Sequence, residues 1–404
     1  MIYVAVLGYG TVGSGVVEVI EKNKDMVNKK SAAQLEIKYI LDLRDFPGDP
    51  YEQKVVHDVN IILEDPEVTI VCETMGGVKP AYDYTRAALL KGKSVCTSNK
   101  ELVASHGPEL LQIAREHSCN YLFEASVGGG IPIIRPLNYS LTAEKLESIT
   151  GILNGTTNYI LTKMEKEGAD FAATLKKAQE KGYAERNPEA DIEGYDACRK
   201  IAILSSLMTG QNVSYENIYT EGISRITADD FVYARAAGKS IKLLAMSKDT
   251  PKGTLAMVSP CMIGAENPLY MVSGVFNAVC VRGNMLGDSM YYGKGAGKLP
   301  TASAVVSDVV DCARHQGKTI MCFWSQEAAK MVDIGDVERS FFVRAAAEAA
   351  ADVEAAFPGA ERISVEGRSQ DCGYFTPPIK EKEFAARYQA LGDRALSRIR
   401  LEMV

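Results

Sequence analysis

The chain has 404 residues, and at about 150 residues per domain this length indicates two or three domains. Apolar residues make up 46% and charged residues 24% of the chain, which is typical of a globular protein with a real core. The net charge of −7, without a cluster of Lys and Arg, argues against a nucleic-acid partner. No run of about 18 apolar residues is present, so we expect no membrane span.

The chain starts with a strand pattern and not with a basic, apolar leader, so we expect no secretory signal. Nine dispersed cysteines indicate free thiols in a reducing compartment, and we expect a cytoplasmic protein.

The first third of the chain alternates short apolar runs with helical stretches. Strands are expected at 2–7, 36–42, 69–73, 93–97 and 120–124, with helices at 79–91 and 107–118 among them. This alternation predicts βαβ units and a doubly wound parallel sheet. We therefore expect an α/β chain that begins with a Rossmann-type domain over 1–135, completed by 296–316.

The pattern changes after Pro136. A strand at 145–153, a helix at 155–167, a long helical zone at 170–210 and strand-like runs within 253–292 predict a mixed α/β domain over 136–295. Residues 338–404 follow the order strand, helix, strand, strand, helix, strand. That order is typical of a ferredoxin-like α+β domain.

A glycine-rich turn follows the first expected strand and opens a helix, with the sequence Gly8-Tyr9-Gly10-Thr11-Val12-Gly13. In this context the motif indicates a dinucleotide site. Its first Gly permits the tight turn, its second lets the backbone approach a pyrophosphate, and its third lets helix and strand pack closely. We expect Gly8, Gly10, Thr11, Val12 and Gly13 to bind the cofactor; the alternative is a tight turn without a ligand.

The end of the second expected strand carries two conflicting signals for the ribose. Asp42 would accept a hydrogen bond from a ribose 2′-hydroxyl and favour NAD, whereas Arg44 would pair with a 2′-phosphate and favour NADP. The choice between NAD and NADP stays open.

Further cofactor-binding candidates follow the ends of later strands, where doubly wound sheets bind ligands. They are Thr74, Thr97 and Lys100. A lysine at this place can reach both the nicotinamide and a substrate oxygen, which suits proton transfer. The alternative, which the position leaves equally open, is a solvated lysine that begins the next helix.

Residues 178–200 form an acidic segment that ends in a lysine. If its last part is helical, Asp196 and Lys200 share a face and can pair. Because an apolar run follows, Lys200 is expected to be partly buried and held by carboxylates, as a general acid or base would be. Taken alone, an acidic run is more often a surface helix with ordinary ion pairs.

Together these motifs resemble the homoserine dehydrogenase family over roughly residues 1–315. The most specific part of the resemblance is the acidic segment, through Ala178, Gly182, Asn187, Pro188, Asp191, Gly194, Asp196 and Lys200. The resemblance also includes the segments 8–13, 97–101, 124–131, 151–157, 295–297 and 300–303.

The resemblance implies an enzyme that interconverts L-homoserine and L-aspartate 4-semialdehyde with NAD or NADP, in threonine, methionine and isoleucine biosynthesis. Carried over by position, Lys200 is the proton donor to the carbonyl oxygen and Lys100 the second active-site lysine. The implied substrate-binding residues are Glu185, Asp191, Asp196, Tyr183, Gly155 and Thr156. Gly297 is implied as a backbone contact near the cofactor.

The resemblance further implies a monovalent cation, Na⁺ or K⁺, held by carbonyl oxygens at Glu124, Val127, Gly129 and Ile131. A plain Gly-rich connection between domains is an equally good interpretation of this segment. It also implies a homodimer or homotetramer formed through the catalytic and dimerisation domain at 136–295.

Many family members end in an ACT domain that senses amino acids, and residues 338–404 have a similar order of elements. The Pro-Gly turn usual in that domain is absent here, where the chain reads Val343-Arg344-Ala345-Ala346. An amino-acid effector at this ACT-like domain and a structural or dimerising role are both open.

Two other functions compete with a homoserine dehydrogenase. Another NAD(P)-dependent oxidoreductase of amino-acid metabolism is the main alternative, although an aspartate-semialdehyde dehydrogenase fits poorly because no motif places a His beside a nucleophilic Cys. A non-enzymatic sensor of dinucleotide and amino acid would not need the two lysines and the acidic segment.

Overall fold

A computed structural model describes residues 1–402, and the chain divides into two compact units. The first unit comprises residues 1–145, 202–215 and 293–329; the second comprises 146–201, 216–292 and the chain from Lys330 onward. The predicted C-terminal domain therefore lies within the second unit. Within the described residues, no helix has the length and apolar character that crossing a membrane requires.

The first unit is built on a six-stranded parallel sheet with the order β3-β2-β1-β4-β5-β6. The predicted Rossmann-type sheet is thereby confirmed. Because successive strands run outward in both directions from β1, the order reverses between β1 and β4, and ligands bind at the carboxyl ends of strands at such a point. The strands are β1 (Ile2–Leu7), β2 (Leu35–Leu41), β3 (Val55–Val56), β4 (Val68–Glu73), β5 (Ser94–Thr97) and β6 (Tyr121–Leu122).

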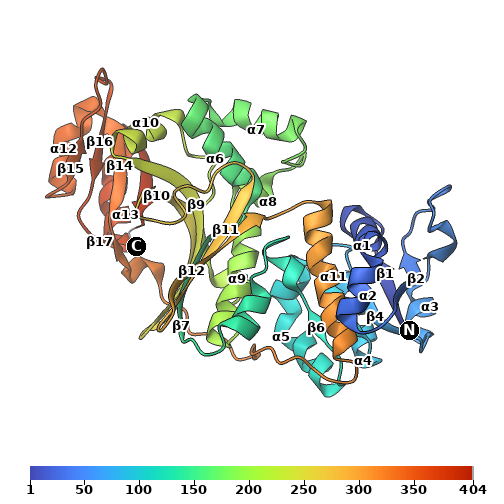
Figure 1. Cartoon of the computed structure of the whole chain (residues 1–404). Helices are drawn as coiled ribbons and strands as arrows, with labels where there is room; N and C mark the ends of the chain where they lie inside the picture. The colour runs from blue at the N-terminus through green and yellow to red at the C-terminus, as the bar shows by residue number, and fades with distance from the viewer. Residues whose placement is uncertain (403–404) are drawn as a thin grey trace. The chain divides into compact units, whose positions relative to one another are not determined.

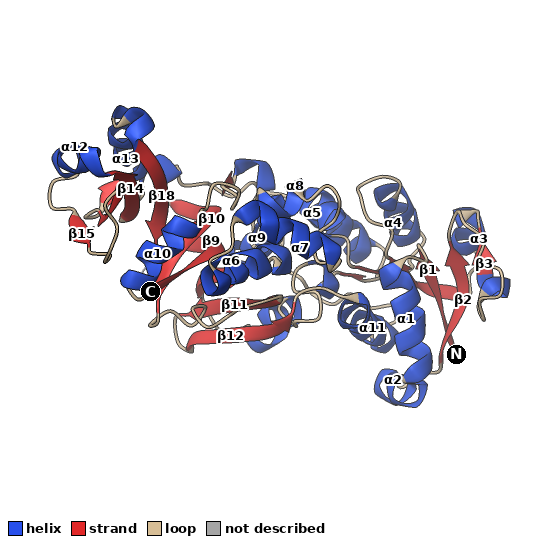
Figure 2. Ribbon diagram, turned by 90° about the horizontal axis from the view of Figure 1, so that it is seen from above, coloured by secondary structure: helices blue, strands red, loops and turns tan. Residues whose placement is uncertain are grey.

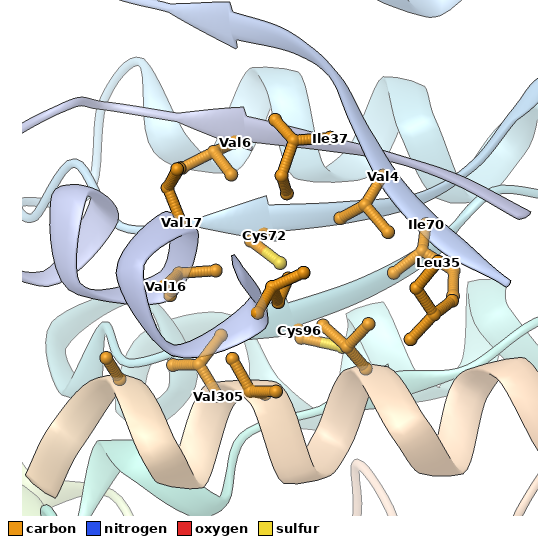
Figure 3. Close-up of a cluster of buried hydrophobic side chains, with 14 of the residues drawn as sticks. Val4, Val6, Val16, Val17, Leu35, Ile37, Ile70, Cys72, Cys96 and Val305 are labelled. Atoms are coloured by element: carbon orange, nitrogen blue, oxygen red, sulfur yellow. The ribbon is translucent and has the colours of Figure 1, made fainter. Parts of the chain in front are cut away.

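Helices cover this sheet, and α11 packs beside α1 although the two are far apart in the sequence (Figure 1). Figure 3 shows the core beneath them, in which Val16 and Val17 of α1 and Val305 of α11 meet apolar side chains from the strands. The helices are α1 (Thr11–Lys22), α2 (Lys24–Ser31), α3 (Val59–Glu64), α4 (Ala81–Leu90), α5 (Lys100–Glu116) and α11 (Lys298–Arg314).

The second unit contains one long mixed sheet with the order β12-β11-β7-β9-β10-β18-β14-β16-β15, and β8 also pairs with β10. Its centre is the long antiparallel hairpin of β9 and β10. The strands are β7 (Leu146–Ile152), β8 (Tyr219–Thr220), β9 (Lys239–Thr250), β10 (Gly253–Gly264), β11 (Phe276–Gly283), β12 (Gly287–Lys294), β14 (Phe341–Ala346), β15 (Glu361–Ile363), β16 (Asp371–Phe375) and β18 (Ala395–Leu401). A separate pair joins β13 (Glu338–Arg339) to β17 (Ile379–Lys380).

The helices between these strands include α6 (Gly155–Glu167), α7 (Phe171–Glu180), α8 (Glu189–Ile192), α9 (Tyr195–Thr209) and α10 (Ala228–Ala236). The expected helical zone over 170–210 is thus divided. The interruptions include Gly182 and Gly194, which both adopt positive φ, a conformation that ends helices and that Gly adopts readily.

Apart from the two-residue strand β17, residues from Phe341 onward have the predicted order of strand, helix, strand, strand, helix, strand, with α12 (Ala350–Ala356) and α13 (Glu381–Ala390). Both helices lie on the same side of β14 and β18 (Figure 2). Their apolar contacts with the strands include Val353, Phe384, Phe341 and Tyr374. β18 also pairs in parallel with β10, so these strands continue the long mixed sheet of the second unit.

Candidate functional site

The glycine turn links β1 to α1 and is held in one conformation by close backbone contacts. Gly8 has a φ of +89°, which favours Gly. A Cβ on Gly13 would lie 1.9 Å from the Gly8 carbonyl oxygen, so only Gly fits there. By contrast, a Cβ on Gly10, the residue before α1, would meet nothing within 4 Å. The backbone at Gly10 is open to a ligand, at the helix N-terminus where N–H groups attract phosphate.

Asp42 and Arg44, the two residues that gave conflicting signals, form an ion pair in the structure. Arg44 Nε donates to Asp42 Oδ1 (2.9 Å) and Arg44 Nη2 to Asp42 Oδ2 (3.0 Å). The Tyr9 backbone N–H, within the glycine turn, also donates to Asp42 Oδ2 (2.8 Å). The hydrogen bond from Arg44 holds the pKa of the Asp42 carboxyl well below its usual range. Both residues therefore stand beside the turn as charged groups.

The ends of β4 and β5 carry polar side chains that are tied to each other. Thr74 Oγ1 donates to the Leu7 and Gly8 carbonyls (3.0 and 2.9 Å). Thr97 Oγ1 donates to the buried Glu73 carboxylate (2.6 Å), whose pKa is raised by burial although hydrogen bonds oppose the shift. These contacts fix the carboxyl edge of the sheet.

Lys100 is the first residue of α5, and Asn99 caps that helix by accepting from the Leu102 N–H (3.1 Å). The helix was expected only from 107; it starts seven residues earlier because Asn99 supplies this cap. Lys100 therefore begins a helix directly after β5, and its side chain is half-buried.

The proposed cation segment is a buried turn that follows a short helical turn over Glu124–Ser126. Gly129 has a φ of +57°. Within the described part of the chain, the carbonyl oxygens of Val127, Gly129 and Ile131 accept no hydrogen bond, although all three residues are buried. Buried carbonyls without partners are rare, and alternate carbonyls of this kind fit the oxygen ligands of a monovalent cation.

The acidic segment and its lysine form a connected chain of polar contacts in the second unit. Lys200 Nζ donates to Asp196 Oδ2 (2.7 Å) and to the Leu153 carbonyl (2.8 Å). Asn154 Nδ2 donates to both Asp191 Oδ1 (2.7 Å) and Asp196 Oδ2 (2.9 Å). Lys200 and Asp196 are buried, which rules out a solvated surface helix for the last part of the segment, whereas Glu185 and Glu189 before it are exposed.

The other predicted substrate-binding residues lie next to the segment that carries Leu153 and Asn154, or are tied to it. Asn154 Oδ1 accepts from the Thr157 N–H (2.9 Å) and caps α6, so Gly155 and Thr156 lie at its N-terminus. Thr156 Oγ1 donates to the Tyr183 carbonyl (2.6 Å), which ties the 183 region to this helix. The Tyr183 ring is half-exposed and packs on the Tyr159 ring at a centroid distance of 5.0 Å.

Glu185 is the predicted substrate residue that the structure does not bring into this chain of contacts. Its side chain is exposed and makes no hydrogen bond or ion pair within the described residues. Gly297, predicted near the cofactor, is the residue before α11 and adopts a φ of +124°.

Asn154 and the Leu153 carbonyl are the site groups that sequence reasoning missed. Asn154 stands directly before Gly155-Thr156-Thr157, where Asn is a favoured helix cap, so the capping role had a visible signal. Its contacts with Asp191 and Asp196 had none, because they depend on chain folding over 37 and 42 residues.

Comparisons with known proteins point to one family. Residues 8–124 match a family model described as homoserine dehydrogenase, NAD binding domain, and residues 132–310 match a model described as homoserine dehydrogenase. The chain is 44% identical over 314 residues to a homoserine dehydrogenase from Synechocystis, covering 76% of this chain and 72% of that protein. It is 40% identical to one from Helicobacter pylori, covering 84% and 80%.

The chain is also similar to solved structures of homoserine dehydrogenases. A homoserine dehydrogenase from Thiobacillus denitrificans superposes with a TM-score of 0.90 at 34% identity, covering 99% of this chain and 98% of that one. A hyperthermophilic archaeal homoserine dehydrogenase in complex with NADPH superposes with a TM-score of 0.64 at 27% identity, covering 77% and 97%.

Proposed function

Since the chain belongs to the homoserine dehydrogenase family, it is an NAD(P)-dependent oxidoreductase acting on a CH–OH group, and we propose which of its residues carry the reaction. The reaction interconverts L-homoserine and L-aspartate 4-semialdehyde in amino-acid biosynthesis. The nicotinamide, when bound, accepts or donates the hydride, because no side chain can do so. The residues of the chain must hold the substrate and move one proton.

Lys200 is the residue we assign to proton transfer, and its contacts are the observation that carries this assignment. Within residues 1–402, two of its three N–H donors are used, one on Asp196 and one on the Leu153 carbonyl. These contacts fix the amine and leave one N–H to face the substrate oxygen. On reduction Lys200 gives a proton to the carbonyl oxygen; on oxidation its amine takes the hydroxyl proton.

Asp191 and Glu185 are assigned to the substrate ammonium group, and Asp196 to the orientation of Lys200. Asp191 accepts from the same Asn154 amide as Asp196, so one side chain positions both carboxylates. Glu185 is exposed, and we propose that its carboxylate pairs with the ammonium only when substrate is bound. Gly155, Thr156 and Tyr183 complete the pocket, with Thr156 holding the backbone of Tyr183.

For the cofactor we propose contacts from Gly8, Gly10, Thr11, Val12 and Gly13 to the pyrophosphate. Thr74, Thr97, Lys100 and Gly297 are assigned to the rest of the dinucleotide. The archaeal relative binds NADPH, and Arg44 offers a cation for a 2′-phosphate here too. Asp42, which Arg44 neutralises, suits the ribose hydroxyl of NAD, so we propose that the enzyme accepts both dinucleotides.

We also propose a Na⁺ or K⁺ ion at the carbonyls of Glu124, Val127, Gly129 and Ile131. A cytoplasmic homodimer or homotetramer is proposed, with the nine free thiols supporting a reducing compartment. For the C-terminal domain a structural role is favoured over an amino-acid effector site, because β18 is paired into the sheet of the second unit.

The substitution Lys200→Met tests the assignment. It keeps the length of the side chain and removes the amine, so we expect kcat to fall by about 10³-fold, within the range for loss of a general acid. Binding of reduced dinucleotide, measured by its fluorescence, should be unchanged. Activity is followed at the reduced-nicotinamide absorbance band with homoserine and each of NAD and NADP.

Lys242→Met is the matched control, because Lys242 is also buried and donates to a backbone carbonyl, that of Val272 (2.8 Å). Its turnover per folded molecule should match the wild type. Normal turnover in Lys200→Met would exclude Lys200 as the proton donor.

A further inference from the structure

Asp308 on α11 is a buried carboxylate that none of the roles above uses. It is 2% exposed. Its Oδ2 accepts from the backbone N–H of Glu124 (2.9 Å), and its Oδ1 accepts from Arg135 Nη2 (2.7 Å). One side chain of α11 therefore holds both the first and the last residue of the segment 124–135.

The Glu124 side chain closes the same segment from inside. Its Oε1 accepts from the N–H groups of Ile133 (2.6 Å) and Ile134 (3.0 Å), and its Oε2 accepts from the N–H of Arg135 (2.6 Å). Hydrogen bonds from backbone N–H groups to a buried carboxylate are among the stronger ones in proteins. Glu124 and Asp308 together fix where the chain enters and leaves the turn at 127–131.

Between these fixed ends, the turn packs tightly on the segment that leads into α11. Gly130 N donates to the Lys294 carbonyl (3.2 Å). A Cβ on Gly129 would lie 2.2 Å from the Gly295 carbonyl oxygen, and one on Gly130 would lie 2.7 Å from Pro300 Cβ. Any shift of the turn is therefore passed to residues 294–297.

We propose that Asp308 is a positioning residue, which sets the carbonyl oxygens of Val127, Gly129 and Ile131 and the segment next to Gly297 by holding both ends of the turn. The functional consequence rests on the proposed roles of these residues toward the cation and the dinucleotide. Among the described contacts, Asp308 touches neither the carbonyl oxygens that we propose as cation ligands nor Gly297.

Asp311 supplies a matched control one turn along α11. Its Oδ2 accepts from Nε of the same Arg135 (2.9 Å), but among the contacts of the described residues it has no hydrogen bond with Glu124. Loss of an ion pair with Arg135 is therefore common to Asp308→Asn and Asp311→Asn. Only Asp308→Asn also affects the contact with the Glu124 backbone, because the single amide oxygen of Asn cannot accept from the Glu124 N–H and from Arg135 at the same time.

The direct test is amide hydrogen exchange over a peptide covering 124–135 in the full-length protein. We expect Asp308→Asn to speed exchange there by about tenfold or more and Asp311→Asn to leave it near wild type, because exchange reports local opening. Equal exchange in wild type and Asp308→Asn, or an equal rise in both variants, would overturn the proposal. If Asp308→Asn does not fold, Asp308→Glu replaces it, since Glu keeps the charge beside Arg135 but moves the oxygen that accepts from the Glu124 N–H.

Two further measurements separate positioning from general stability. Thermal unfolding in KCl or NaCl, compared with choline chloride at equal ionic strength, should show cation stabilisation in the wild type and in Asp311→Asn that is reduced in Asp308→Asn. In kinetics, Asp308→Asn should lower kcat and weaken reduced-dinucleotide binding while the KM for homoserine stays within about twofold. If cation stabilisation, kcat and dinucleotide binding fell equally in both variants, Asp308 would have a structural role only.

These experiments also distinguish a failure of this proposal from a failure of the proposed function. If the wild type does not oxidise homoserine, the proposed activity fails. If cations have no effect on its stability, the proposed cation site fails. The exchange experiment still decides whether Asp308 holds the turn.

Discussion

Asn154 is the residue on which the two carboxylates of the candidate site depend, because its amide donates to both Asp191 and Asp196. Asn154→Asp keeps the oxygen that caps α6 but replaces the donor with a third carboxylate. The like charges must separate, and Asp196 then no longer holds Lys200 in place. We expect kcat to fall by about 100-fold, as for a misplaced catalytic group.

The measurement is the steady-state rate of homoserine oxidation together with circular dichroism. Asn154→Ser, which retains a capping oxygen and adds no charge, should fall between wild type and Asn154→Asp in rate. An Asn154→Asp enzyme with wild-type kcat would show that the amide plays no part in positioning Lys200.

Asp42 and Arg44 are expected to set the choice of dinucleotide between them. Asp42→Asn removes a negative charge beside the ribose, so the ratio of kcat/KM for NADP to that for NAD should rise by about tenfold. Arg44→Ala removes the cation that pairs with a 2′-phosphate, so the same ratio should fall by a similar factor. Assays with both dinucleotides measure the ratio, and a change in the same direction for both variants would contradict this division of roles.

At the scale of single residues, the sequence predicts contacts between side chains that lie on one helix. Asp196 and Lys200 are four residues apart, and the structure pairs them as expected on one helical face. Asn154 was missed since its partners come from another segment. Glu185 could be placed in the sequence, but its exposed side chain in the structure could not be anticipated from a pattern of acidic residues.

Among the elements, the turn from β1 to α1 offers a contrast between two glycines of one motif. Gly13→Ala would place a Cβ 1.9 Å from the Gly8 carbonyl and 2.8 Å from Thr74 Oγ1. We expect a loss of about 2 kcal/mol in the free energy of unfolding together with loss of dinucleotide binding, because the backbone must move. Gly10→Ala meets no atom of the chain, so it should cost less than about 1 kcal/mol.

Gly10→Ala should nevertheless weaken dinucleotide binding, since the added methyl group occupies the space that a pyrophosphate would approach. Urea unfolding and fluorescence titration with reduced dinucleotide measure the two quantities separately. Tight binding by a well-folded Gly10→Ala protein would argue that the pyrophosphate lies elsewhere.

The elements of the first unit could be predicted from the sequence because parallel strands buried on both faces are short apolar runs separated by helices. The helix at 155–167 was predicted with its observed bounds, since Asn154 and Gly168 mark its ends. β9 was not anticipated. Its residues 240–247 are all buried, and the short apolar run 243–246 within them does not distinguish a strand from a helix.

On the scale of a whole unit, the C-terminal strands are continuous with the long sheet of the second unit, and an ion pair also joins them to α10. Arg344 of β14 is 6% exposed and donates to Asp230 of α10 (2.9 Å) and to Asp371 of β16 (3.0 Å). Arg344 stands within Val343-Arg344-Ala345-Ala346, which was expected to join the first strand to the first helix, but the structure places these residues in β14 and the connection at Ala347–Ala349. The sequence showed that the turn was absent; only the structure shows that a buried arginine joins this region to α10.

The last prediction concerns this buried network and pH. Arg344→Met leaves the Asp230 carboxylate buried without its partner, which typically costs about 3 kcal/mol in the free energy of unfolding. Burial acts to raise the pKa of Asp371, but hydrogen bonds from Arg368 and Arg344 outweigh it and lower the pKa below its usual value. Asp371 therefore stabilises the folded state above its unfolded pKa of about 4, and this contribution is lost as pH falls through the lowered folded value.

It follows that the difference between wild type and Arg344→Met, measured by urea unfolding, should be largest near neutral pH and should shrink as the pH is lowered below about 4. Arg362→Met is the matched control, because Arg362 is exposed on β15 and lies over the Tyr374 ring. It should change stability by less than about 0.5 kcal/mol. A difference for Arg344→Met that grows on acidification would show that the pairing with Asp371 does not stabilise the fold.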